Sequence, residues 1–120
     1  MVYLKEKRMI HFKESEFTMG GENVFDKMDP KFLILLDELR EDYGHPLTIT
    51  SSYRSATYNA SIGGAKHSQH LLGKACDLAC TDSTLRAVLV HDALDLGLTV
   101  GVGKTFVHVD SRDKQIMFTY

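Results

Sequence analysis

The sequence lacks the features that direct a chain to a membrane or to nucleic acid. No apolar run approaches the roughly 20 residues that a membrane helix needs, and residues 1–12 lack the apolar stretch of a signal peptide. The formal net charge is only -2, without the concentrated basic surface that phosphate-backbone binding requires. We therefore expect no membrane span, no nucleic-acid partner, and synthesis in the cytoplasm without a signal peptide.

Cysteine is also scarce, with only Cys76 and Cys80 in the whole sequence. In a strand, these two side chains would point to the same face and lie about 13 Å apart, since each residue advances the chain by about 3.3 Å. A disulfide requires Cα atoms within about 7 Å of each other. No Cys/His pair at zinc-finger spacing accompanies them. We therefore predict two small buried thiols.

The remaining composition is typical of one folded domain. The chain has 120 residues, of which 43% are hydrophobic and 25% charged, and it shows no internal repeat, low-complexity tract or Pro/Gly-rich linker. A chain of this length can bury a continuous core without disulfides. We predict a single domain over residues 1–120, acting as a monomer.

The spacing of apolar residues predicts helices and strands that are mixed along the chain. A helix over 30–43 is favoured by a cap at Asp29, by Pro30 in its first turn and by Gly44 at its end. The other predicted elements are a β-capable opening over 2–4, a turn at 20–21, a strand over 47–52, a short helix over 55–60, a strand over 74–79, a helix capped by Ser83 that stops at Gly97, and paired strands over 106–110 and 115–120. Because helices and strands do not strictly alternate, we predict an α+β fold with a small antiparallel sheet packed with helices.

Two predicted strands carry ionisable side chains among apolar ones. In the strand over 74–79, Asp77 projects from a face that it shares with two alanines, and a buried carboxylate needs a cation or several donors. Gly73 permits a tight bend that would bring His70 over the same face. In the strand over 106–110, His108 and Asp110 share one face.

A metal site is one explanation of this pattern, and separate structural roles are another. Two imidazoles and one carboxylate from separate segments, His70, Asp77 and His108, can supply three zinc ligands and leave a fourth position for water, as in catalytic zinc sites. Each of these residues alone has an ordinary explanation, as a core histidine or a turn aspartate. Spacing alone does not decide between these explanations, and the metal site is favoured by the longer pattern to which the three residues belong.

These residues belong to a longer pattern, Ser-x-His-x-x-Gly-x-Ala-x-Asp over 68–77 followed by His-Val-Asp over 108–110. The pattern resembles the zinc D-alanyl-D-alanine carboxypeptidase family (peptidase family M15), which shares its fold with the hedgehog signalling domain. The resemblance covers about residues 12–112 and includes Ser-Ser-Tyr-Arg over 51–54, Tyr-Asn over 58–59 and Gly-Gly-Ala over 63–65. It implies a zinc peptidase that hydrolyses amide bonds in the peptide stems of bacterial peptidoglycan, as a carboxypeptidase or an endopeptidase.

The resemblance also implies individual roles. His70, Asp77 and His108 correspond to the zinc ligands, which makes Zn²⁺ the expected cofactor. Arg54 corresponds to an arginine that contacts the substrate or stabilises developing negative charge.

The general base is indicated less directly. Relatives often place a glutamate a few residues before the last ligand, or a second histidine two residues before it, whereas this chain has Thr105 and Phe106 there. We predict Asp110 as the base, because it shares a strand face with the last ligand; the alternative is an acceptor that orients a ligand imidazole. His67 and Ser68 flank the site and are predicted to bind substrate.

Two other functions are compatible with the sequence. A domain of the same fold can bind zinc without hydrolysing a substrate, as hedgehog shows, and the missing glutamate keeps this alternative open. A structural component of a phage particle would need no metal. For the enzyme, the compact chain without a signal peptide favours a phage or prophage lysin that reaches the cell wall after release.

Overall fold

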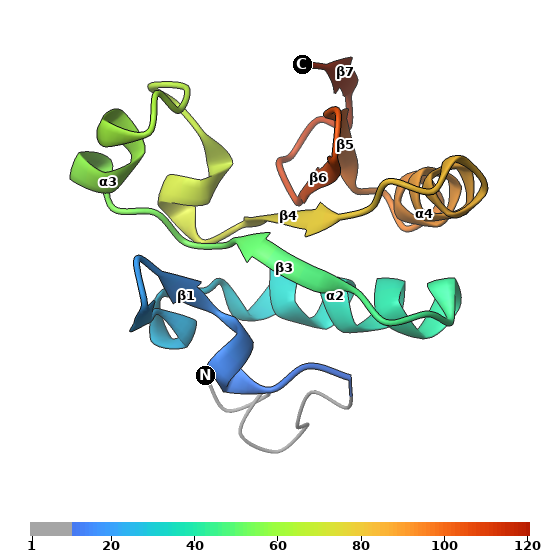
Figure 1. The fold of residues 1–120 in the computed structure, drawn as a ribbon, viewed down its shortest axis with the longest axis horizontal. Coiled ribbons are helices and arrows are strands. Elements are labelled where there is room, and N and C mark those ends of the chain that lie inside the picture. The colour runs from blue at the N-terminus through green and yellow to red at the C-terminus, as the bar shows by residue number, and fades with distance from the viewer. Residues whose placement is uncertain (1–10) are drawn as a thin grey trace.

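The computed structural model describes residues 11–120 (Figure 1), so the strand predicted over 2–4 lies outside the described residues. The helices are α2 (Pro30–Tyr43), α3 (Ala56–Ser61) and α4 (Ser83–Asp95), with short 3-10 turns η1 (Glu14–Glu16), η2 (Phe25–Lys27) and η3 (Gln69–Leu72). The strands are β1 (Thr18–Met19), β2 (Glu22–Asn23), β3 (Thr48–Ser51), β4 (Ala75–Ala79), β5 (Thr99–Val102), β6 (Phe106–Asp110) and β7 (Met117–Thr119). Within 11–120, no helix has both the length and the apolar character of a membrane span.

The helix α2 forms where the sequence predicts it. The carboxylate of Asp29 accepts a hydrogen bond from the backbone N–H of Phe32 at 3.0 Å, and Pro30 occupies the first turn. Gly44 ends the helix in the left-handed conformation, with φ +75°. The face buried against the sheet consists of Phe32, Leu33, Leu36, Leu39 and Tyr43.

The helix α4 is capped one residue earlier than predicted. Asp82, not Ser83, is the capping residue, and its carboxylate accepts from the backbone N–H of Leu85 at 2.9 Å. The prediction of Ser83 as the cap was wrong because the carboxylate one position earlier already satisfies that donor. Leu89 and Ala93 are buried and belong to the core.

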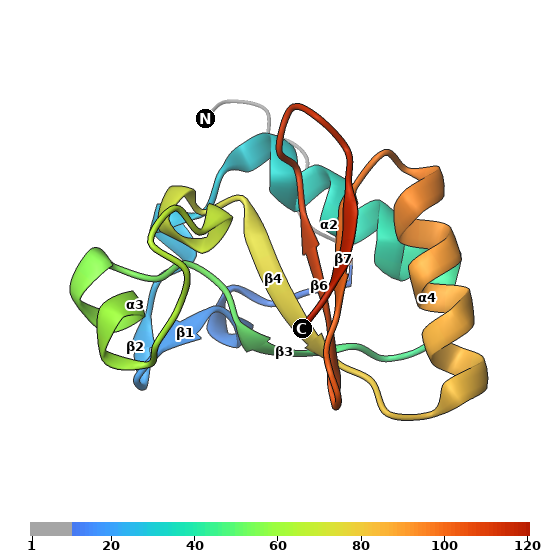
Figure 2. The same cartoon turned by 90° about the horizontal axis from the view of Figure 1, so that it is seen from above.

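The main sheet has five strands in the order β3-β4-β6-β5-β7. Neighbouring strands run antiparallel except for β5 and β7, which are parallel. The side chains of Cys76 and Leu78 point into the core cluster with those of α2 and α4. The two cysteines are free and buried, as predicted. In both views α3 and α4 lie on opposite sides of the central strands (Figures 1 and 2). The predicted α+β fold with a small, mainly antiparallel sheet is confirmed.

The predicted pairing of the last two strands is wrong. The strand β6 lies between β4 and β5, whereas β7 pairs with β5. The sequence did not predict β5, because Gly101 and Gly103 in and beside it are typical of a loop. In the structure these glycines make room for rings: a Cβ at Gly101 would overlap Phe118, and a Cβ at Gly103 would overlap Phe106.

Candidate metal centre

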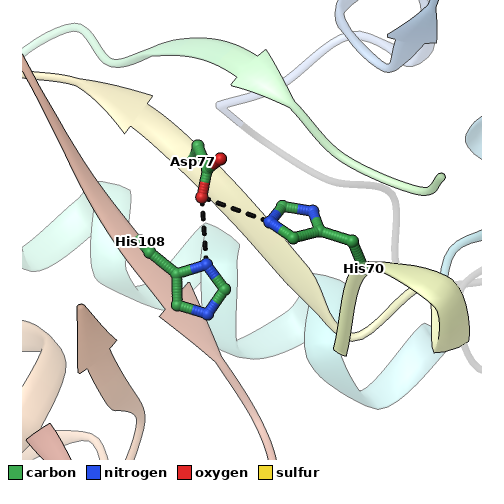
Figure 3. Close-up of side chains that lie close together, drawn as sticks. All are labelled: His70, Asp77 and His108. Atoms are coloured by element: carbon green, nitrogen blue, oxygen red, sulfur yellow. Dashed lines mark hydrogen bonds and ion pairs between the residues drawn. The ribbon is translucent and has the colours of Figure 1, made fainter. Parts of the chain in front are cut away.

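Three elements bring the predicted ligands together on the sheet face opposite the core (Figure 3). Asp77 lies in the middle of β4, directly across the antiparallel ladder from His108 in β6. His70 belongs to η3, whose first turn is capped by the side chain of Ser68. Gly73 ends η3 with φ +70°, and a Cβ at this position would overlap the backbone carbonyl oxygen of Lys27. The bend predicted at Gly73 therefore places His70 over β4.

The three side chains converge on one oxygen. Asp77 Oδ1 lies 3.2 Å from His70 Nε2 and 3.0 Å from His108 Nδ1, as the dashed lines in Figure 3 show. The three donor atoms all lie within 4.8 Å of one another, and all three residues are buried. A single ion can therefore contact all of them.

Hydrogen bonding at the other ring nitrogen fixes the tautomer of His70. Its Nδ1 lies 2.6 Å from the backbone carbonyl oxygen of Ser52. A carbonyl oxygen only accepts, so Nδ1 must carry the proton. In the neutral ring, the lone pair is then on Nε2, which points at Asp77.

The same constraint acts on His108 from the opposite side. Its Nε2 lies 2.7 Å from Asp110 Oδ2. Burial favours the neutral acid at Asp110, but hydrogen bonds from His108 and Arg112 outweigh it and lower the pKa of Asp110 to about 2. The ionised carboxylate accepts the N–H from Nε2, which leaves the lone pair of the neutral ring on Nδ1, again facing Asp77.

Three lone pairs therefore meet in a buried space, and this arrangement requires a positive charge. Burial would raise the pKa of Asp77, but the adjacent imidazoles of His108 and His70 hold this pKa well below its usual range, so the carboxylate is ionised. A protonated His108 can also supply positive charge: burial disfavours its imidazolium, yet the bonds to Asp110 and Asp77 raise the pKa of His108. Two imidazoles and a carboxylate, each imidazole held by an acceptor behind it, are a donor set that fits zinc.

Arg54 lies beside this centre and binds its carboxylate. The Nη2 donor is 3.2 Å from Asp77 Oδ2, the oxygen that the histidines leave free. The other donors of the guanidinium bind Asn59 Oδ1 at 3.1 Å and Ser51 Oγ at 3.0 Å. Arg54 therefore fixes the orientation of Asp77, and its contact with substrate stays a prediction.

Asp110, the predicted base, lies behind His108 rather than beside the converging donor atoms. It is fully buried, and it accepts from Arg112 Nε at 2.9 Å and Nη2 at 2.6 Å. A carboxylate with a pKa near 2 and all of these partners is a weak proton acceptor. The geometry favours the alternative left open by the sequence, an acceptor that orients the ligand imidazole; the role as base stays a prediction.

The variant Asp110→Asn separates these two roles. An orienting Asp110 predicts a zinc dissociation constant raised by about 10- to 100-fold, because loss of such a partner weakens the metal site by this factor. A general base instead predicts unchanged zinc affinity and a large loss of kcat. Competition with a chromophoric chelator measures the first quantity, and Asp113→Asn, an exposed carboxylate nearby, is the matched control. Wild-type zinc affinity in Asp110→Asn would contradict the orienting role.

The remaining predicted site residues lie at the edge of η3. Ser68 is partly buried and uses its hydroxyl to cap the turn that carries His70, while His67 is exposed. Their binding of substrate stays a prediction. The sequence assigned no role to Asn59 or Arg112, whose contacts with Arg54 and Asp110 appear only in the folded chain.

Known proteins resemble this chain in sequence and in fold. The family model described as Peptidase M15 matches residues 10–110. A zinc D-Ala-D-Ala carboxypeptidase of Streptomyces albus G is 46% identical over 33 residues, which are 28% of this chain and 13% of that protein. The L-Ala D-Glu endopeptidase ChiX of Serratia marcescens has a similar fold, with a TM-score of 0.54 and 16% identity over 91% of this chain and 95% of that one. The family model covers most of the chain and confirms the resemblance inferred from the sequence: the chain belongs to peptidase family M15.

Proposed function

We propose that this protein is a zinc-dependent peptidase that hydrolyses an amide bond in the peptide stems of bacterial peptidoglycan. The observation that carries the proposal is the convergence of His70 Nε2, Asp77 Oδ1 and His108 Nδ1, each imidazole with its other nitrogen bound to an acceptor. Support for zinc and for this substrate comes from the names of the two relatives, a zinc D-Ala-D-Ala carboxypeptidase and an L-Ala D-Glu endopeptidase.

The residues of the chain divide into those that hold the metal and those that keep them in place. His70, Asp77 and His108 would hold zinc, which supplies a Lewis acid for the scissile carbonyl and a bound water of lowered pKa. The Ser52 carbonyl and Asp110 keep each imidazole in the tautomer that presents its lone pair. Because these hydrogen bonds hold the imidazoles in position, little reorganisation is needed during the reaction.

Arg54 contributes fixed positive charge next to this centre. Its guanidinium is held by Asn59 and Ser51 and is mostly buried, with 12% of the side chain exposed. In a site shielded from water, such a charge stabilises a neighbouring carboxylate or a developing oxyanion more strongly than it would in solvent. We propose that it acts on Asp77 in the resting protein and on the substrate during hydrolysis.

Digestion of purified peptidoglycan fragments, followed by mass spectrometry, tests the proposal and identifies the bond. We expect the zinc-loaded protein to release D-alanine or to cut within the stem, and the protein treated with a chelator to do neither. Intact fragments with one zinc per chain would favour a non-catalytic zinc-binding module instead. Far less than one zinc per chain in unchelated protein would favour a structural component. The role as a phage or prophage lysin and the monomeric state stay predictions.

A further inference from the structure

Three aromatic side chains stand beside the metal centre on the same sheet face. Phe106 of β6 and Tyr120, which follows β7, have ring centroids 4.9 Å apart, and Phe118 lies 5.5 Å from Tyr120. The imidazole of His108 is 5.6 Å from the Phe118 ring and 6.4 Å from the Tyr120 ring. We call Phe106, Phe118 and Tyr120 the aromatic wall.

Gly101 allows the aromatic wall to approach the metal-ligand residue His108. Gly101 lies directly opposite His108 in the pairing of β5 with β6, and directly opposite Phe118 in the pairing of β5 with β7. A Cβ at Gly101 would overlap the Phe118 ring and lie 3.0 Å from Cε1 of Tyr120. Because Gly101 has no side chain, the rings of Phe118 and Tyr120 can extend across β5 toward His108.

The aromatic wall is not part of the hydrophobic core. The core lies on the other sheet face, under α2 and α4, and contains none of the three rings. Phe106 and Phe118 are only partly buried, and Tyr120 is 69% exposed. Exposed aromatic rings beside a buried polar centre are typical of ligand-binding surfaces.

The wall is nevertheless held in place by the groups that orient the metal ligand. The guanidinium of Arg112 lies 5.6 Å from the centroid of Phe118, within cation-π range, and the same guanidinium binds Asp110. Asp110 in turn binds His108. One chain of contacts thus fixes a ligand imidazole and the adjacent ring, which reduces the entropy lost when a peptide binds.

We propose that the aromatic wall binds the substrate peptide by packing against an alanine methyl group and the backbone next to the scissile bond. This inference rests on the proposed function, and it assigns to Phe118 and Tyr120 a positioning role that the family resemblance did not suggest. Packing of this kind contributes ground-state and transition-state binding equally, so its loss raises KM with little change in kcat.

The variant Tyr120→Ala tests the wall with a stem peptide that contains both an L-Ala-D-Glu and a D-Ala-D-Ala bond. We expect KM to rise about fivefold to tenfold, with kcat within about twofold of wild type. Zinc content and the unfolding temperature should not change, because the side chain is largely exposed. Met117→Ala is the matched control: Met117 is exposed on the same strand but projects from the opposite face.

Phe118→Leu is the second variant, since it keeps an apolar side chain but removes the ring beside His108. If the wild-type protein is active and KM is unchanged in both variants, the substrate-binding role of the aromatic wall is overturned and the proposed function stays intact. A fall in unfolding temperature and zinc content with unchanged KM would show a purely structural role, and would also overturn it. If the wild-type protein neither cleaves nor binds the peptide, the proposed function fails first, and the substrate role of the wall fails with it.

Discussion

Replacing His108 with alanine is expected to abolish stoichiometric zinc binding and to remove peptide hydrolysis. The imidazole supplies one of three converging donor atoms, and Asp77 Oδ1 would keep only His70 as a neighbouring nitrogen donor. Loss of a ligand should reduce metal affinity by more than the roughly 10- to 100-fold that loss of an orienting partner costs. Zinc per chain after dialysis, measured by elemental analysis, gives the result directly.

A second histidine provides the control for this experiment. His91 is exposed on α4, which packs on the core face of the sheet, opposite the ligand set, so His91→Ala should retain one zinc per chain and full activity. The unfolding temperatures of the metal-free proteins must also be compared, because removal of a buried ring leaves a cavity. Tight binding of one zinc per chain by a folded His108→Ala protein would remove His108 from the ligand set.

Zinc is expected to stabilise the protein strongly at pH 7.5 and much less at pH 5.5. A ligand present at about 1,000 times its dissociation constant stabilises the folded state by about 4 kcal/mol, which corresponds to roughly 15 °C in unfolding temperature for a chain of this size. Protons compete for the same lone pairs, and the raised pKa of His108 extends this competition above the ordinary range of histidine. The zinc-induced shift should therefore shrink as the pH falls.

The metal-free protein should show the opposite trend. Because the pKa of His108 is higher in the folded chain than in the unfolded one, protonation of this ring stabilises the fold. That contribution is complete below the unfolded pKa of about 6.5 and disappears as the pH rises through the folded value. Asp110 behaves inversely: its lowered pKa contributes stability above about pH 4, which is lost toward pH 2.

Thermal unfolding from pH 5 to pH 8.5, with excess zinc and with a chelator, checks both trends in one series. We expect the two curves to separate progressively as the pH rises. A zinc-induced shift that is independent of pH would contradict histidine ligation. A metal-free protein that becomes more stable between pH 6.5 and pH 8.5 would contradict the raised pKa of His108.

The local elements of this fold were predictable because their determinants lie close together in the sequence. The Asp29 cap, Pro30 and Gly44 fix both ends of α2 without reference to the rest of the chain. The two cysteines predicted to be buried, Cys76 and Cys80, belong to the core cluster. These patterns depend only on the geometry of one helix or one strand.

The arrangement of the last strands was not predictable in this way. Two adjacent strand-like segments near the end of a chain ordinarily suggest a hairpin, but β5 intervenes between β6 and β7. Its Gly101 is required by the ring of Phe118, which is 17 positions further along the chain. Only the folded sheet shows that this glycine accommodates a neighbour rather than a turn.

The candidate site also combines features that the local sequence predicts with features that appear only in the folded chain. The convergence of His70, Asp77 and His108 followed from a motif, and the structure brings their donor atoms together. The salt bridge of Arg54 with Asp77 joins residues 23 positions apart and has no local pattern. Asp110 and Arg112 are close in sequence and bind each other. The role of Asp110, however, depends on which nitrogen of His108 faces its carboxylate.

The direct opposition of Asp77 and His108 in the ladder between β4 and β6 links metal capture to correct strand alignment. A slip of one residue would turn His108 toward the helices and bring a valine to the polar face. Chains with misaligned strands would therefore be unable to retain the ion. Zinc binding would therefore stabilise only the correctly aligned sheet. Misaligned forms would not gain this stability and would remain open to degradation.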